Sequence, residues 1–270
     1  MRFLCVSCSL SFIKASVLRR RGREEHSDTQ QRFTMCFSLN LSVLVLMLTF
    51  CNQVQAASIL GGNESVPHSR PYMVLLEVTS NQKIKTCGGF LVRDDFVVSA
   101  AHCDGDCIVA KLGVHNVYNG SEQHMKVKKV HKHPNFTKDL LNDIMLLKLE
   151  KKAVFTNHVQ PLALPMENDQ LSDQCLVCGW GRGNIHKPYA SKVLREVNVT
   201  VIPDDTCKEK HVLCTVGDDR PAQGDSGGPL VCGGLAFGVV SYMEDKKNGF
   251  IAYTHIPEYL PWICETMTHH

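Results

Sequence analysis

From residue 59 onward, short runs of apolar residues are separated by residues that form turns. The run at 193–202 alternates strictly: Val197, Val199 and Val201 share one face and polar residues occupy the other, as in a half-buried strand. Strands are predicted at 73–78, 88–100, 107–113, 125–130, 143–150, 174–180, 193–202, 228–242 and 250–256. Many short strands at regular spacing indicate an all-β barrel or sandwich.

Two segments depart from this pattern. The sequence PLALPME at 161–167 predicts a linker between two halves of the chain. Near the C-terminus, Leu260, Ile263 and Met267 recur at helical spacing, which predicts a short helix.

An apolar segment at 41–50 is too short to span a bilayer comfortably. The sequence CNQVQA follows it and places Val54 and Ala56 at the −3 and −1 positions of a signal-peptidase site. We therefore expect a signal peptide over 35–56 that starts at Met35; a buried helix is the alternative.

Composition and charge place the rest of the chain among globular proteins, with 44% hydrophobic and 21% charged residues. Residues 1–34 are polar and unpatterned, and we expect an upstream extension without structure. Residues 1–58 hold seven of the 29 Lys and Arg and three of the 27 Asp and Glu. The remainder carries 22 basic and 24 acidic residues, a net charge of −2, which does not favour nucleic acid. Thirteen cysteines fit an oxidising compartment or metal sites.

One local run, KVKKVHKH at 126–133, is basic. It is typical of a solvated edge strand. A weak glycosaminoglycan contact, stronger when its histidines charge, is the alternative. The lysines concerned are Lys126, Lys128, Lys129 and Lys132.

The candidate chemistry begins with the glycine-rich stretch GDSGGP at 224–229. Acyl transfer by serine needs a nucleophile on a tight turn, a histidine base, a buried carboxylate and N–H donors for the oxyanion. Ser226 can be the nucleophile, with the N–H groups of Gly224 and Ser226 converging on one point. An ordinary turn serine is the alternative.

Two further segments supply the missing groups. SAAHC places His102 just after an apolar strand, and NDIMLLKL places Asp143 at the head of another. An acid that enters an apolar strand is costly unless it is paired. A surface histidine and a turn aspartate are the alternatives, but the order His, Asp, Ser favours catalysis.

The segment from Ile59 to the C-terminus carries ILGG, CGGFLV, SAAHC, DIMLLKL, CGWG, GDSGGPLVC and VVSY. It resembles a chymotrypsin-family serine protease, most closely the granzyme and mast-cell-protease branch. The resemblance implies one protease domain over 59–270, built as two packed six-stranded antiparallel β-barrels with the active site between them.

By that resemblance, His102 is the general base, Asp143 its orienting carboxylate and Ser226 the nucleophile. Ser241 matches the family serine that lies near the catalytic aspartate and starts the strand that pairs with substrate; Tyr242 follows it. The resemblance also implies three disulfides: Cys87–Cys103, Cys175–Cys232 and Cys207–Cys214. Three cysteines are then left over in the mature chain: Cys107, Cys178 and Cys264. Zinc binding by cysteines is the alternative, with CLVC at 175–178 as the one pair at metal-ligand spacing.

Activation follows from the same resemblance. In this family a new terminus, Ile-x-Gly-Gly, inserts and pairs with the acid before the nucleophile, which forms the oxyanion hole; here the pair is Ile59 and Asp225. Ser58 precedes the cleavage point, so a trypsin-like activator is not expected. Signal cleavage after Ala56 leaves the dipeptide 57–58, as in granule-stored relatives that a dipeptidyl peptidase of the cathepsin C type trims.

The cleavage preference stays open. Arg220 aligns with the floor of the primary pocket, where trypsin-like relatives have aspartate, so cleavage after Lys or Arg is disfavoured. A buried guanidinium would favour an acidic side chain. The loop from Cys214 to Ser226 is several residues shorter than in relatives, and Ala222 stands where many of them have a cysteine. An Arg220 that is exposed outside the pocket is therefore an equal alternative. Met243 can narrow the entrance and Ile251 can line the pocket; acidic, small apolar and Met- or Leu-like preferences remain.

We therefore expect a glycoprotein that is secreted or stored in secretory or cytolytic granules. It acts as a serine endopeptidase on proteins and peptides, with no cofactor, no metal and no membrane contact after signal removal. A protease-fold binding or antimicrobial protein that has lost activity is the alternative. A digestive or complement-type protease is disfavoured because no basic residue precedes Ile59. Glycosylation sequons occur at Asn63, Asn119, Asn135 and Asn198.

Overall fold

A computed structural model describes residues 59–120, 122–182, 190–243 and 250–270. The predicted extension, signal peptide and activation dipeptide (1–34, 35–56 and 57–58) lie outside the described residues. No helix among the residues described is long and apolar enough to cross a membrane.

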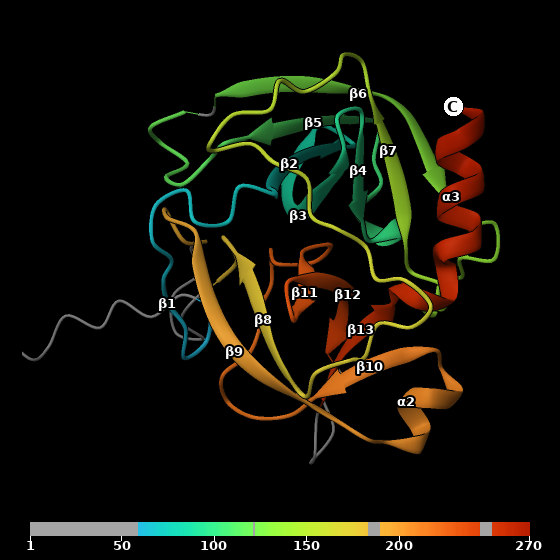
Figure 1. The fold of residues 1–270 in the computed structure, drawn as a ribbon. Helices are drawn as coiled ribbons and strands as arrows, with labels where there is room; N and C mark the ends of the chain where they lie inside the picture. The colour runs from blue at the N-terminus through green and yellow to red at the C-terminus, as the bar shows by residue number, and fades with distance from the viewer. Residues whose placement is uncertain (1–58, 121, 183–189, 244–249) are drawn as a thin grey trace, which may run out of the picture. The chain divides into compact units, whose positions relative to one another are not determined.

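The first half of the described chain forms a closed antiparallel barrel in the order β2-β3-β4-β7-β6-β5. Its strands are β2 (Met73–Ser80), β3 (Lys83–Arg93), β4 (Phe96–Ser99), β5 (Cys107–Leu112), β6 (Gln123–Lys132) and β7 (Met145–Leu149). They occupy the upper half of Figure 1.

A second sheet, in the order β9-β10-β13-β12-β11-β8, closes through the pairing of β8 with β9. Its strands are β8 (Gln174–Gly179), β9 (Arg195–Ile202), β10 (Val212–Thr215), β11 (Pro229–Cys232), β12 (Leu235–Met243) and β13 (Ile251–His255). The short strand β1 (Asn63–Glu64) adds to the edge at β9. Two six-stranded antiparallel barrels are thus confirmed, and residues 161–167 lie in the connection between β7 and β8.

Two predicted strands were wrong in their extent, because each contains a turn. The run 88–100 breaks at Asp94 and Asp95, so that β3 and β4 pair as a hairpin. The run 228–242 breaks at Gly233 and Gly234, whose φ angles of 59° and 85° are those of a tight hairpin turn between β11 and β12.

Two α-helices of the described residues flank the barrels. The expected C-terminal helix, α3, spans Leu260–His269. The helix α2 (Asp205–Glu209) was not predicted. Asp204 caps it, since its side chain accepts a hydrogen bond from the Cys207 N–H at 3.1 Å. The sequence Pro203-Asp204 before α2 was the available signal for this helix.

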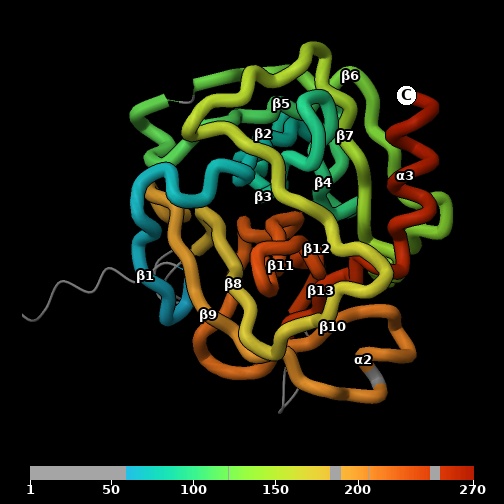
Figure 2. Tube along the Cα trace, in the orientation of Figure 1, coloured from blue at the N-terminus to red at the C-terminus, as the bar shows by residue number. Residues whose placement is uncertain are grey.

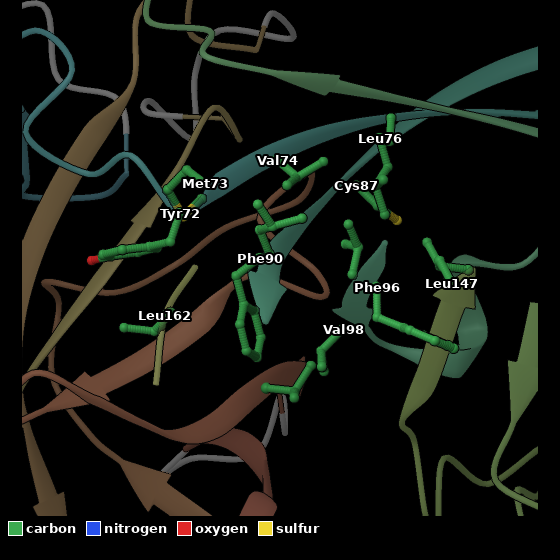
Figure 3. Close-up of a cluster of buried hydrophobic side chains, with 14 of the residues drawn as sticks. Tyr72, Met73, Val74, Leu76, Cys87, Phe90, Phe96, Val98, Leu147 and Leu162 are labelled. Carbon is green, nitrogen blue, oxygen red and sulfur yellow. The ribbon is translucent and has the colours of Figure 1, made fainter. Parts of the chain in front are cut away.

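The core of the first barrel draws on both faces of its strands, since β4 is buried at all four of its positions. Figure 3 shows Phe90, Phe96, Val98 and Leu147 together, contributed by β3, β4 and β7, and all four are fully buried. Each such side chain contributes about 1.5–3 kcal/mol by burial. This packing fixes the end of β4, which His102 follows, and the start of β7, which Asp143 precedes.

The helix α3 returns to the first barrel after the chain has completed the second (Figure 2). Ile263 is fully buried in the cluster that holds the first barrel's core, with Leu260 and Met267 packed against it. Arg93 Nη1 also donates to the Met267 carbonyl at 2.8 Å. The C-terminal helix therefore completes the packing of the first barrel, which is built from the earlier part of the chain.

Candidate active site

Asp143 lies two residues before β7, and its side chain is fully buried. Its Oδ2 accepts hydrogen bonds from His102 Nδ1 at 2.7 Å and from Ser241 Oγ at 2.5 Å. Its Oδ1 accepts the backbone N–H of His102 at 2.9 Å. These bonds offset the cost of burying a carboxylate. With Asp143 ionised, they select the His102 tautomer whose Nδ1 carries the proton and whose Nε2 can accept one.

His102 lies on a short 3₁₀ turn, η1 (Ala101–Cys103), that follows the buried strand β4. The disulfide Cys87–Cys103 ties this turn to β3. The His102 side chain is 26% exposed, so the ring is held on one edge and open on another. A base needs that combination of orientation and access.

The turn that carries Ser226 is held between β3 and β12. Gly88 N–H donates to the Ser226 carbonyl at 2.8 Å, and Gly227 N–H donates to the Val240 carbonyl at 2.8 Å. Gly227 has a φ of 84°, and a Cβ there would lie 2.1 Å from Ser99 Oγ, so only glycine fits.

These contacts bring the Ser226 segment beside the histidine turn. Cys103 Sγ lies 3.7 Å from the Ser226 carbonyl oxygen. Among the hydrogen bonds between described residues, none joins the Ser226 hydroxyl to the His102 ring. Such bonds are often long before substrate binds.

Asp225 precedes the serine and is fully buried. Its Oδ1 accepts Gly181 N–H at 2.7 Å and its Oδ2 accepts Ala222 N–H at 2.8 Å. Burial raises the pKa of Asp225 to about 6, although the two N–H donors lower it. A Cβ at Gly179 or Gly181 would lie 2.0 or 2.4 Å from a carboxylate oxygen. The glycines of CGWG therefore make room for this acid, a role that the motif alone did not reveal.

The start of the protease segment lies close to the same loop. Ile59 is fully buried, and Leu60 forms an antiparallel bridge with Arg220, whose N–H donates to the Leu60 carbonyl at 3.0 Å. The Arg220 side chain is partly buried, and no described residue accepts a hydrogen bond from its buried Nε.

The remaining substrate-pocket candidates share one end of the second barrel. Met243 pairs with Ile251 across β12 and β13, and Tyr242 pairs with Ala252. Ile251 is buried, whereas Met243 is 48% exposed. Ser241, which bonds Asp143, begins this stretch.

The structure contains the three expected disulfides, Cys87–Cys103, Cys175–Cys232 and Cys207–Cys214. Cys107 and Cys264 are exposed free cysteines, and Cys178 is a buried one. Because Cys175 is in a disulfide, the CLVC pair cannot bind zinc as two thiolates. Across the described ranges, no group of three or more His, Cys, Asp or Glu is arranged to hold a metal ion.

The surface features predicted from sequence are exposed. The asparagines of all four sequons are exposed: Asn63, Asn119, Asn135 and Asn198. The four lysines of the basic run are exposed on β6, although Lys132 forms an ion pair with Asp104 at 2.7 Å.

A family model described as Trypsin matches residues 59–263, a span that holds every strand of both barrels and the first residues of α3. The chain belongs to the trypsin family of serine proteases. This protease is 42% identical to a chymase of Cavia porcellus over 238 residues, which cover 83% of this chain and 96% of the relative. It is 40% identical to granzyme B(G,H) of Mus musculus over 246 residues, 85% of this chain and 99% of the relative.

A solved structure titled "Structure of GrC" covers 77% of this chain and 99% of its own, with a TM-score of 0.73 and 39% identity. These relatives place the protease in the granzyme and mast-cell-protease branch, and they make it a serine-type endopeptidase.

Proposed function

We propose that this protease cleaves peptide bonds through an acyl-enzyme on Ser226, with His102 as base and Asp143 as its orienting group. The observation that supports this best is the buried Asp143 carboxylate, which accepts hydrogen bonds from His102 Nδ1, the His102 N–H and Ser241 Oγ. It orients the ring so that Nε2 can take up a proton.

In the first half of the reaction, Ser226 Oγ attacks the scissile carbonyl carbon and passes its proton to His102 Nε2. The N–H groups of Gly224 and Ser226 stabilise the oxyanion. His102 then gives the proton to the leaving amine, the C–N bond breaks, and an ester on Ser226 remains. In the second half, water replaces the amine; Asp143 stays ionised throughout and stabilises the imidazolium.

Activation by the new terminus of Ile59 is supported by the state of Asp225. Its carboxylate is fully buried with two N–H donors, and its pKa is raised to about 6. The Ile59 side chain is already buried. Cleavage before Ile59 by a dipeptidyl peptidase creates an ammonium group that can pair with this acid, because a buried charge gains most from a partner.

We further propose that the primary pocket accepts an acidic side chain. The Nε of Arg220 is buried and has no hydrogen-bond acceptor among the described residues. A substrate carboxylate would supply that acceptor and pair with the guanidinium charge. The Leu60–Arg220 bridge links the position of Arg220 to the segment whose terminus activation would release.

The experiment uses protein that begins at Ile59, a mixed peptide library and mass spectrometry of the cut sites, with Ser226→Ala as the control. We expect cuts after Asp or Glu that disappear in the control. Cuts after Met, Leu or Phe would refute the proposed role of Arg220 and leave the protease mechanism intact. No cuts from folded protein with the correct terminus would refute the protease mechanism and favour the binding or antimicrobial alternative.

We also propose that the protein is a glycoprotein, secreted or stored in granules. The four exposed sequon asparagines support glycans. The exposed lysines of β6 support a weak glycosaminoglycan contact, made weaker at Lys132 by its ion pair with Asp104. Burial and nearby positive groups lower the pKa of His131, so its charge adds to this contact only in acid.

A further inference from the structure

A cavity of about 720 Å³ lies against the C-terminal helix α3, and we call it the α3 cavity. Its walls come from the connection between the barrels at 166–171, from Phe237 of β12, and from residues 255–264. In that last segment the chain runs from β13 through the 3₁₀ turn η2 (Ile256–Tyr259) into α3 (Figure 1). Phe237 is four residues before Ser241, about 13 Å along β12, and the catalytic residues do not line the cavity. The α3 cavity is therefore separate from the active site.

The walls of the α3 cavity are mainly apolar. Phe237 is buried in the core of the second barrel, and Leu171 packs against the same core. Leu260 of α3 packs against the core of the first barrel. Met166, which also lines the cavity, is 78% exposed and so lies at its mouth. A cavity of about 300–1,000 Å³ with mostly apolar walls is the usual form of a site for one small molecule.

The unpaired charges at the α3 cavity are negative. Glu167 and Asp169 line it from an exposed turn, and within the described ranges neither carboxylate forms an ion pair. Asp169 Oδ2 accepts the Met166 N–H at 2.7 Å, which holds this carboxylate on the turn. None of the described lining residues is a lysine or an arginine. The lining His255 is already matched, because its Nδ1 lies 3.0 Å from the Glu258 carboxylate.

We propose that the α3 cavity binds a small organic cation, a molecule with an apolar body that carries one ammonium or guanidinium group. Phe237, Leu171 and Leu260 receive the apolar body, whose burial supplies most of the affinity. Glu167 and Asp169 pair with the positive group at the mouth. A neutral analogue buries the same apolar area without the ion pair, and an anionic analogue is repelled by both carboxylates. The charge of the ligand therefore decides its affinity.

The test titrates phenylbutylamine into protein that begins at Ile59 and carries Ser226→Ala, with binding measured by ligand-observed NMR. Phenylbutanol and phenylbutyrate are the neutral and anionic probes with the same apolar body. We expect a dissociation constant on the order of 1 mM for the amine, because so small a molecule gains little binding energy. The alcohol should bind about threefold more weakly and the acid more weakly still, and this difference should shrink in 0.5 M NaCl.

Two exposed free cysteines locate the bound amine. Cys264 lines the α3 cavity and Cys107 does not. Cys264→Trp places a large side chain in the cavity and should abolish binding of the amine. Cys107→Trp is the matched control and should leave the affinity unchanged. The unfolding midpoint of each variant shows that it is folded.

Charge variants test the carboxylates without filling the cavity. Glu167→Gln combined with Asp169→Asn should lower the affinity for the amine about threefold, to that for the alcohol, and should not change the affinity for the alcohol. The asparagine keeps an oxygen that can accept the Met166 N–H. Glu265→Gln is the matched control, because Glu265 is exposed on α3 beside Cys264 and does not line the cavity; the affinity should be unchanged.

Several results would overturn the proposal. These are no binding of the amine at ten times the expected dissociation constant, equal affinities for the three probes, or amine binding that survives Cys264→Trp in folded protein. An acetylated dipeptide amide of phenylalanine and lysine that binds more than tenfold tighter than the amine would show a peptide site instead. The cleavage mechanism is tested separately by the cut sites and their loss in Ser226→Ala, so failure of either proposal leaves the other standing.

Discussion

The buried acid before the serine allows a prediction whose sign depends on the N-terminus. Asp225→Asn is made in protein that retains the residues before Ile59 and in protein that begins at Ile59. In the first form, burial raises the pKa of Asp225 to about 6, against an ordinary value of 3.8. A shift of about 2 units corresponds to about 3 kcal/mol.

The direction follows from which state binds the proton. Between about pH 4 and pH 6, the folded protein keeps the Asp225 proton while the unfolded chain releases it. This contribution to stability is complete below about pH 4 and is lost as the pH rises through 6. The substituted asparagine lowers the free energy of unfolding by about 1–3 kcal/mol, because its amide N–H faces a backbone N–H. Asparagine does not titrate, so this loss is the same at every pH.

The assay is urea unfolding from pH 4 to pH 7.5, in a Ser226→Ala background that prevents self-cleavage. We expect the free energy of unfolding of wild type minus that of Asp225→Asn to fall by about 3 kcal/mol between pH 4 and pH 7. In protein that begins at Ile59, the new ammonium should remove or reverse this fall. A difference that is flat with pH in the longer form would refute the reasoning.

Three further predictions concern the same framework. Asp143→Asn should lower kcat by about 10⁴-fold with little change in KM, because the His102 tautomer is no longer fixed; a fluorogenic peptide assay that finds less than a tenfold loss would contradict this. Gly179→Ala should lower the free energy of unfolding by about 2 kcal/mol in urea, because its Cβ would lie 2.0 Å from the Asp225 carboxylate; an unchanged value would show that the loop moves easily. Removing the Cys207–Cys214 disulfide by paired serines should cost about 2.5 kcal/mol, measured as a lower unfolding midpoint, and an unchanged midpoint would argue against the bridge.

The sequence predicted the strands best where alternation was strict. Residues 195–202 form β9 with buried valines and exposed polar residues between them. It predicted them worst where two buried strands are joined by a tight turn, as at Gly233 and Gly234, because apolar residues on both sides of the turn form one continuous run. The periodicity of a run does not show where the chain reverses.

The site divides in a similar way. Motifs indicated His102, Asp143 and Ser226, since their chemistry is tied to residue type. The supporting contacts could not be derived from motifs, because they depend on backbone atoms that every residue has: the Gly181 and Ala222 N–H groups on Asp225 are examples.

The return of α3 to the first barrel has a consequence for biosynthesis. Arg93 and Met267, joined by a hydrogen bond, are 174 residues apart in sequence. As the ribosome extends the chain, every strand of the first barrel leaves the exit tunnel long before Ile263 is made. That barrel must wait with part of its apolar surface uncovered until translation ends, so its folding is completed only after release, and a premature stop codon near the 3′ end of the message would damage the half of the protein translated first.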